Sequence, residues 1–143
     1  MAVWTLIVEL EPPINFTCAD GTGIEKGTLL ALSDPMTAAA SAADGDLIAG
    51  VAAEEKIAND GKTKIAVYRR GIFKATAGGN CTAGYALASY SSTGDANDVI
   101  NGAVDDLNSQ SCAIALETAT DGETLLVELC PGMATVNTVD EAE

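Results

Sequence analysis

The sequence predicts a mainly β protein, folded as a compact β-barrel or β-sandwich. Three observations support this fold class. Short apolar or alternating runs are separated by turn residues, the chain holds 14 glycines against 4 prolines, and similar segments recur at a nearly constant spacing. With 143 residues and 48% apolar content, the chain is long enough to bury a core without staples. It has six aromatic residues, so that core is made of small aliphatic side chains.

The first 14 residues contain an apolar, β-prone run that stops at Pro12-Pro13. The run is compatible with an ordinary first strand of the domain. It is also compatible with an extended arm that adds to the sheet of a neighbouring subunit, since the two prolines separate it from the rest of the chain. We assign residues 1–14 as an N-terminal arm, with Trp4, Leu6 and Val8 as candidate partner contacts.

Residues 15–132 are predicted to form a single domain, and residues 133–143 an acidic, disordered tail. Turn signals precede a strand over 28–32, and residues 37–46 form a loop because they show no amphipathic period. Further strands are expected over 85–90, near Val99, over 111–117 and over 123–129.

The central stretch, residues 46–77, is predicted to be a β-hairpin with its turn at Asn59-Asp60-Gly61. In its second run Ile65, Val67 and Ile72 are expected to face inward. Gly71 interrupts the alternation, where a bulge or a close approach of another backbone would fit.

Three pairs of segments indicate an internal pseudo-repeat. Residues 27–32 resemble 84–89, residues 48–54 resemble 111–117, and residues 60–67 resemble 121–127, at offsets of 57, 63 and 61 residues. Two copies of a strand-loop-hairpin unit predict a pseudo-symmetric barrel or sandwich of about seven to nine strands. Chance similarity among small apolar strands is the alternative.

Charge is unevenly distributed along the chain. The net charge is −14, and residues 75–143 hold 11 acids and no base. Such a surface repels nucleic acid. Six of the seven cations lie between residues 56 and 74. These residues are either the solvated outward positions of the hairpin or, as we predict, a basic face that meets an acidic protein surface. The candidate contacts are Lys62, Lys64, Arg69, Arg70 and Lys74.

No motif indicates catalysis, a metal or a cofactor. The chain has no histidine, and Gly61-Lys62-Thr63 lacks the earlier glycine of a phosphate-binding loop. The four cysteines are scattered without a Cys-x-x-Cys pair, so a metal site is not expected. Buried free thiols are expected, with disulfides as the alternative. No apolar run has the ~18 residues of a membrane-spanning helix. We therefore predict a non-enzymatic protein without membrane or nucleic-acid partners.

The succession of Lys26-Gly-Thr-Leu-Leu-Ala-Leu32, Asp34-Pro35, Ile48-Ala-Gly-Val-Ala52, Gly61-Lys-Thr-Lys-Ile-Ala-Val67 and Arg69-Arg-Gly-Ile-Phe73 resembles small head-decoration, or cement, proteins of tailed phages and related viruses. The resemblance spans roughly residues 16–131. It implies a β-rich protein that binds the outside of the mature capsid, commonly as a trimer, and that is assembled in the host cytoplasm. The major capsid protein is then the expected partner, and the protein stabilises the shell. The alternative is a secreted or surface β-barrel binding module, for instance one that recognises glycans.

Overall fold

The computed structural model describes residues 3–42, 46–90, 97–101 and 111–131. The described residues form eleven strands and no helix, which confirms the mainly β prediction. The predicted acidic tail lies outside the described residues. The strands are β1 (Thr5–Glu9), β2 (Ile14–Thr17), β3 (Leu29–Asp34), β4 (Thr37–Ala40), β5 (Ile48–Ala52), β6 (Lys64–Tyr68), β7 (Gly71–Thr76), β8 (Ala86–Tyr90), β9 (Asp98–Asn101), β10 (Ser111–Ala115) and β11 (Thr124–Leu129).

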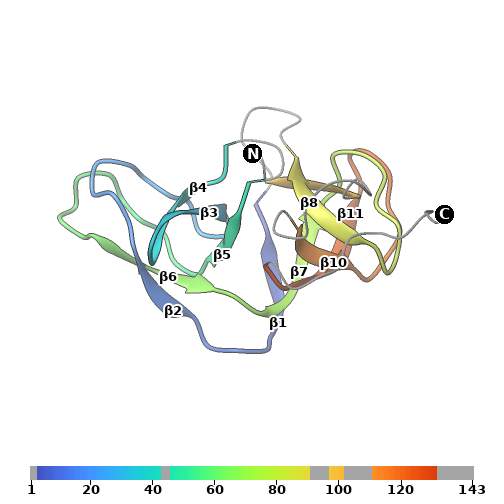
Figure 1. Ribbon diagram of the computed structural model, residues 1–143, viewed down its shortest axis with the longest axis horizontal. Helices are drawn as coiled ribbons and strands as arrows, with labels where there is room; N and C mark the ends of the chain where they lie inside the picture. The colour runs from blue at the N-terminus through green and yellow to red at the C-terminus, as the bar shows by residue number, and fades with distance from the viewer. Residues whose placement is uncertain (1–2, 43–45, 91–96, 102–110, 132–143) are drawn as a thin grey trace.

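The strands build two bodies that lie side by side (Figure 1). Five strands form a closed barrel in the order β2-β4-β3-β5-β6, and the other six form a sheet in the order β1-β7-β11-β10-β8-β9. The chain passes from the barrel to the sheet at Arg69 and Arg70, between β6 and β7. The sequence anticipates a barrel or sandwich of seven to nine strands; the structure divides eleven strands between two bodies.

The two bodies are built on one plan. In the barrel β6 pairs with β5, β5 with β3 and β3 with β4, while β2 pairs with β6. In the sheet β11 pairs with β10, β10 with β8 and β8 with β9, while β7 pairs with β11. In the barrel a parallel bridge joins Thr17 of β2 to Thr37 of β4. In the sheet a parallel bridge joins Ala77, just after β7, to Val99 of β9. We call residues 14–68 the first half and residues 71–130 the second half.

Turn geometry confirms the repeat at the level of the backbone. Gly27 and Gly84, 57 residues apart, have φ values of 92° and 88°, and Gly61 and Gly122 have 86° and 87°. These values lie in the region that side chains disfavour, which explains why glycine occupies all four positions. Each half also has one isolated bridge at the same place, Ile24 with Lys56 and Cys81 with Ala119.

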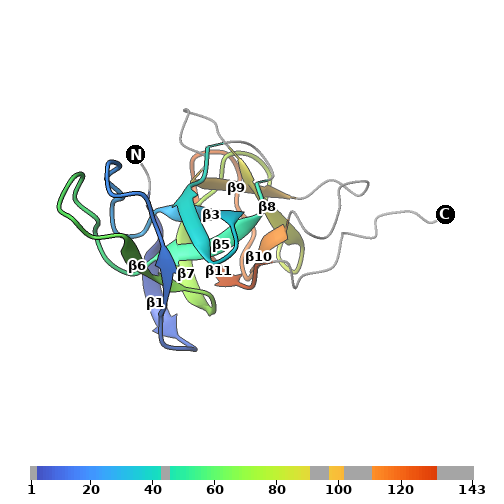
Figure 2. The ribbon, with the colours of Figure 1, turned by 60° about the vertical axis from the view of Figure 1, so that its left-hand side comes forward.

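The halves share part of their core. One cluster lies inside the barrel around Phe16, Leu30, Ile65 and Val67. The larger cluster fills the second half and also includes side chains of β3 and β5. Figure 2 shows these two strands beside the six-stranded sheet. The residues contributed by these two strands are Leu29, Ile48 and Val51. The two halves are therefore joined by packing as well as by the chain.

The N-terminal strand belongs to its own chain. β1 pairs antiparallel with β7, with Leu6 opposite Phe73 and Val8 opposite Ile72. Trp4 is 3% exposed, its ring meets that of Phe73 edge-on at 5.8 Å between centroids, and its backbone N–H donates to the carbonyl of Gly27. Within this chain β1 is thus an ordinary first strand of the sheet, and addition of residues 1–14 to the sheet of a neighbouring subunit stays a prediction.

Two sequence-based expectations are wrong. Residues 37–40 form β4, because strand pairing with β3 and not amphipathicity determines their conformation. The predicted hairpin holds for β5 and β6 but ends at Tyr68, since β7 joins the other sheet. Phe73 consequently faces the core in place of Ile72, which lies on the outer face. Gly71 does have a close neighbour, because a Cβ there would lie 3.1 Å from the carbonyl oxygen of Val8.

Candidate partner-binding surface

The eight sequence-predicted contact residues lie in three different environments. Trp4 is buried, and its indole Nε1 donates to the backbone oxygen of Asn97 at 2.8 Å. It is therefore a core residue and not available to a partner, which corrects its assignment. Leu6 is half-buried against the same core. Val8 is 44% exposed and remains accessible.

The basic residues follow the chain from one half to the other and do not form one face of a hairpin. Lys62 and Lys64 are exposed on the first half, in the β5–β6 loop and at the start of β6. Arg69 and Arg70 connect the halves, and Arg70 pairs with Glu128 at 3.4 Å. Lys74 is exposed on β7. The structure thus assigns the predicted basic residues to two surfaces.

Apolar side chains form a row across the outer face of the six-stranded sheet. Val8 lies opposite Ile72, Ile72 opposite Glu128, and Glu128 opposite Ile114. On the neighbouring row Lys74 lies opposite Leu126. An antiparallel sheet with one solvated face usually carries polar residues there. Val8 is 44% exposed, whereas the other three are half-buried and Ile114 packs on Ala86 and Cys130. We call Val8, Ile72, Ile114 and Leu126 the apolar face.

The equivalent positions of the first half have similar exposure. Ala52 pairs with Val67 as Ala115 pairs with Val127, so strand register equates Leu126 with Ala66 and Lys74 with Asn15. Ala66 is half-buried like Leu126, and Asn15 is exposed like Lys74.

The first half holds a buried lysine. The side chain of Lys56 is 1% exposed, and its Nζ donates to Oδ1 of Asp60 at 2.8 Å and to Oδ1 of Asp20 at 3.1 Å. It also reaches the carbonyl oxygens of Asp20 and Ile57 at 3.0 and 2.7 Å. At the equivalent position the second half has Ala119.

Hydrogen bonding keeps this cluster ionised. Desolvation lowers the pKa of Lys56, but hydrogen bonds to Asp60 and Asp20 outweigh it and the pKa is raised. The pKa of Asp60 falls from 3.8 to about 2, chiefly because Lys56 donates to it and also because the Lys62 backbone does. The cluster is thus a set of satisfied ion pairs that closes the β5–β6 loop.

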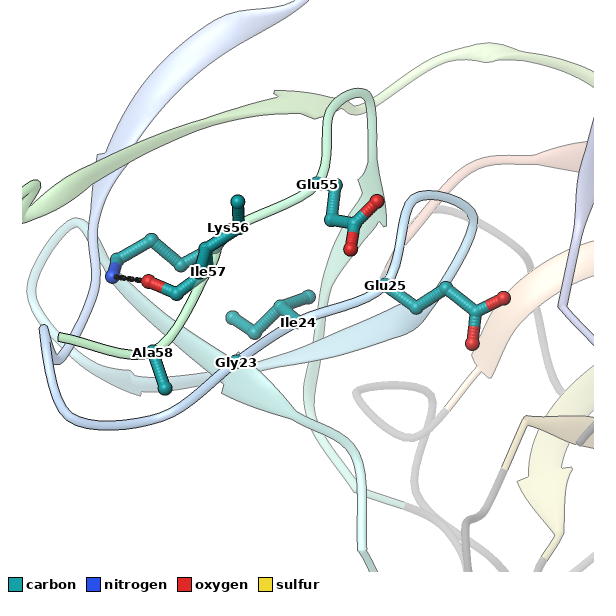
Figure 3. Close-up of a pocket in the computed structure, with 7 residues that line it drawn as sticks. All are labelled: Gly23, Ile24, Glu25, Glu55, Lys56, Ile57 and Ala58. Carbon is teal, nitrogen blue, oxygen red and sulfur yellow. Dashed lines mark hydrogen bonds between the residues drawn. The ribbon is translucent and has the colours of Figure 1, made fainter. Parts of the chain in front are cut away.

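Beside the lysine lies a groove of about 400 Å³, lined by Gly23, Ile24, Glu25, Glu55, Lys56, Ile57 and Ala58. Figure 3 shows the Glu25 and Glu55 carboxylates at one end of the groove and the ammonium of Lys56 turned away at the other. Ile57 is 64% exposed. We call Glu25, Glu55 and Ile57 the acidic groove, because it combines two carboxylates with an exposed apolar side chain.

The thiols are free and buried, as the sequence predicts. Burial raises the pKa of Cys81 to about 11 and that of Cys112 further, so both thiols are protonated at neutral pH. Among the described residues no group of three or more His, Cys, Asp or Glu side chains is placed to hold a metal ion. No described helix is long and apolar enough to cross a membrane.

The fold is similar to a known one. At 18% sequence identity and a TM-score of 0.54, the structure matches that of the N base of head fiber gp8.5 in bacteriophage phi29. The match covers 87% of this chain and 98% of that chain. No protein-family model and no curated protein sequence matches the chain. The likeness therefore concerns the fold, which both proteins share along almost the whole length of the phi29 chain.

Sequence reasoning misses the apolar face. It assigns Val8 to a partner contact and Ile72 to the core, and it gives Ile114 and Leu126 no role. The signal is present in the alternation of β11, where buried Leu125, Val127 and Leu129 leave Leu126 on the opposite side. The acidic groove cannot be recognised from the sequence, because its two segments are 30 residues apart and meet only through the Ile24–Lys56 bridge.

Proposed function

We propose that this chain is a structural protein of a phage head that binds the outer surface of the capsid shell and stabilises it, as a decoration protein does. The observation that carries the proposal is the likeness in fold to the N base of a phage head fiber. The resemblance of residues 16–131 to head-decoration proteins supports it from the sequence. The proposed partner is the major capsid protein, and the proposed location is the outside of the virion, reached after assembly in the host cytoplasm.

The proposed action is adhesion, with no catalytic step. We expect a homotrimer, because symmetry-related copies turn a modest contact with each capsid subunit into a tight overall attachment. Exposed ion pairs are each worth only ~0–1 kcal/mol, so apolar contacts must supply most of the attraction. The exposed apolar side chains of the described surface are the material for such contacts. They include Ile7, Val8, Leu10 and Ile14 near the N-terminus.

Co-sedimentation with phage heads tests the proposal. The purified protein is mixed with mature heads of the parent phage that lack it and with precursor shells, and the pellets are quantified. We expect saturable binding to mature heads, weak binding to precursor shells, and a higher temperature of head disruption when the protein is bound. An unrelated acidic protein of similar size is the control for charge. Failure to bind mature heads, or binding equal to that of the control, would contradict the proposal.

A further inference from the structure

The barrel of the first half is closed by a short seam between β2 and β4. The two strands share one parallel pair, Thr17 with Thr37, and the Thr17 N–H donates to the carbonyl of Met36 at 2.7 Å. β2 ends at this pair. Among the described residues, no backbone hydrogen bond joins residues 18–25 to residues 38–40. We call these two segments the open seam.

Strand register identifies the equivalent seam in the second half. Leu30 pairs with Ala40, and Leu87, at the same place in the repeat, pairs with Asn101. β4 therefore corresponds to β9, with Ala40 at the position of Asn101. The facing segment of the second half begins with residues 77–80, because they follow β7 as the open seam follows β2.

The second half closes its seam with its own backbone. The Gly78 N–H donates to the carbonyl of Val99 at 2.8 Å, and the Asn101 N–H donates to the carbonyl of Asn80 at 3.0 Å. Neither bond has a counterpart between the described residues of the open seam. The plan of the fold therefore provides for backbone pairing at this place, and the first half leaves it unused.

The length of the connection explains the difference. Four residues, 77–80, lead from the end of β7 to the bridge residue Cys81. Six residues, 18–23, lead from the end of β2 to the bridge residue Ile24. The longer connection does not follow β4, so the edge of that strand stays uncovered.

This edge directs backbone groups into the seam. The Ser41 N–H donates to the carbonyl of Leu29 at 2.9 Å, so Ala40 and Leu30 form a non-hydrogen-bonded pair of the β3–β4 ladder. The N–H of Ala40 consequently points away from β3, and it has no partner among the described residues. Unpaired backbone groups on a strand edge are a template for the addition of another strand.

Two hollows lie along the open seam and share Ile24 and Ala40. The first, of about 120 Å³, extends along β4, and the second, of about 100 Å³, continues past Ala40 to Asn97. Small side chains make up most of the lining, so the backbone of a bound peptide can come close to β4. They include Ala19, Thr22, Ala38 and Ala39 in the first hollow and Gly23 and Ser41 in the second.

An unpartnered donor stands at the end of the second hollow. Asn97 is 1% exposed, and its Oδ1 accepts from the N–H of Leu29 at 3.0 Å. Its Nδ2 has no hydrogen-bond partner among the described residues. A buried amide without a partner is costly, so this group indicates that an acceptor binds beside it. The carbonyl of a bound peptide is such an acceptor.

The surroundings of the seam are acidic. Glu25 lines the second hollow, and the carboxylate of Asp46 accepts from the hydroxyl of Ser41 at 3.2 Å. No lysine or arginine is among the described residues that line the two hollows. A second copy of this chain, with a net charge of −14, is therefore a poor source of the peptide.

We propose that the open seam binds an extended peptide segment of the capsid protein, which adds to β4 as a further strand. The segment is neutral or basic and has small side chains, as the charge and the lining of the seam require. The inference rests on the proposed function for the source of this peptide. It adds the place of attachment, on the first half of the molecule.

Removing one N–H tests strand addition. Ala40→Pro deletes the donor that points into the seam but keeps the β3–β4 ladder, which does not use this N–H. Ala40→Ser keeps the N–H and is the matched control. We expect roughly tenfold weaker co-sedimentation with mature heads for Ala40→Pro and unchanged binding for Ala40→Ser. Circular dichroism and the melting temperature verify that each variant is folded.

Amide hydrogen exchange tests the same contact in the unmodified protein. The Ala40 amide should exchange roughly tenfold more slowly when the protein is bound to heads, because it then donates to the added strand. The amide of Asp121, in an exposed turn of the second half, is the control and should not change. Asn97→Asp, which keeps the acceptor for Leu29 but loses the donor, should also weaken head binding.

Three results would overturn the inference: equal head binding by Ala40→Pro and the wild type, an Ala40 amide that heads do not protect, or unchanged head binding by Asn97→Asp. Sedimentation velocity without heads examines the other occupant. Self-association that is lost in Ala40→Pro and kept in Ala40→Ser would assign the seam to a second copy. Absence of head binding by the wild type contradicts the proposed function, whereas normal head binding by Ala40→Pro contradicts only the role of the seam.

Discussion

The two halves share a strand order and equivalent turns but differ in the charge that they bury. The first half holds an ionised lysine inside, at Lys56. The second half has Ala119 at the equivalent position. The strand pairing is nevertheless the same. The fold therefore depends on features common to both halves and not on the buried charge.

The common features are few. Each half has glycines at the same two left-handed turn positions, and each has one buried phenylalanine on its first paired strand, Phe16 or Phe73. Each also has a glutamate that accepts from a backbone N–H of the last strand, Glu54 from Ala66 and Glu117 from Leu126. Substitutions at equivalent positions can therefore distinguish stabilising interactions that both halves share from those found in only one half.

The largest effect is expected at the phenylalanines. Phe16→Ala should lower the free energy of unfolding by about 3–5 kcal/mol, the usual cost of a cavity of this size. Phe73→Ala should cost more, because Phe73 also meets Trp4 and Tyr68 edge-on at 5.8 Å each, and such pairs are worth about 0.5–1.5 kcal/mol. Urea unfolding measures both values. Equal costs would mean that the ring contacts add nothing beyond burial.

The next largest loss of stability is expected at two turn glycines, and it should differ between them. Gly84→Ala should cost about 1–2 kcal/mol, since φ is +88° and a Cβ meets no atom within 4 Å. At Gly27 a Cβ would lie 2.5 Å from the carbonyl oxygen of Trp4, so Gly27→Ala should add roughly 1–3 kcal/mol of steric cost. Thermal unfolding of the two variants tests the difference. If Gly84→Ala were the more damaging, the packing of β1 against this turn would be wrong.

The buried lysine gives the first half a pH dependence of its own. The pKa of Asp60 is about 2 when folded, below its ordinary 3.8, so its stabilisation is complete above pH ~4 and is lost as pH falls toward 2. The raised pKa of Lys56 adds stability that is lost only as pH rises above 10.5. Lys56→Met should destabilise the protein and reduce the dependence of its stability on pH at both the acidic and the alkaline end. Urea midpoints measured from pH 2 to 11, with Lys26→Met as the exposed control, provide the test.

The smallest effects are expected at the equivalent glutamates. Glu54→Ala and Glu117→Ala each remove one acceptor, at 2.8 and 3.0 Å from a backbone nitrogen, on an exposed part of the chain. Each should cost about 0.5–1 kcal/mol, because water can replace the carboxylate. Amide hydrogen exchange should accelerate at Ala66 in one variant and at Leu126 in the other. Acceleration at neither amide would show that these bonds do not protect the strand.

The sequence predicts the repeat better than it predicts the surface. Turn glycines and short apolar strands are local signals, so the class, most strand positions and the repeat can be derived from them. The strand over residues 37–40 escapes prediction because β4 depends on β3, a partner that local pattern does not reveal. The prediction misplaces Ile72 because the chain changes sheets at Arg70, which reverses the face that each later residue occupies. It misassigns Trp4 because the acceptor of its indole is 93 residues away.

That long separation has a consequence for synthesis on the ribosome. The barrel closes through contacts within residues 14–68, so its partners emerge early. Trp4 and β1 emerge before the barrel, yet their partners include β7 and Asn97, far along the chain. This strand must therefore wait, with its indole and its backbone edge unpaired, until the second half has been translated. It is made before the barrel but placed after it, and a stalled chain exposes it.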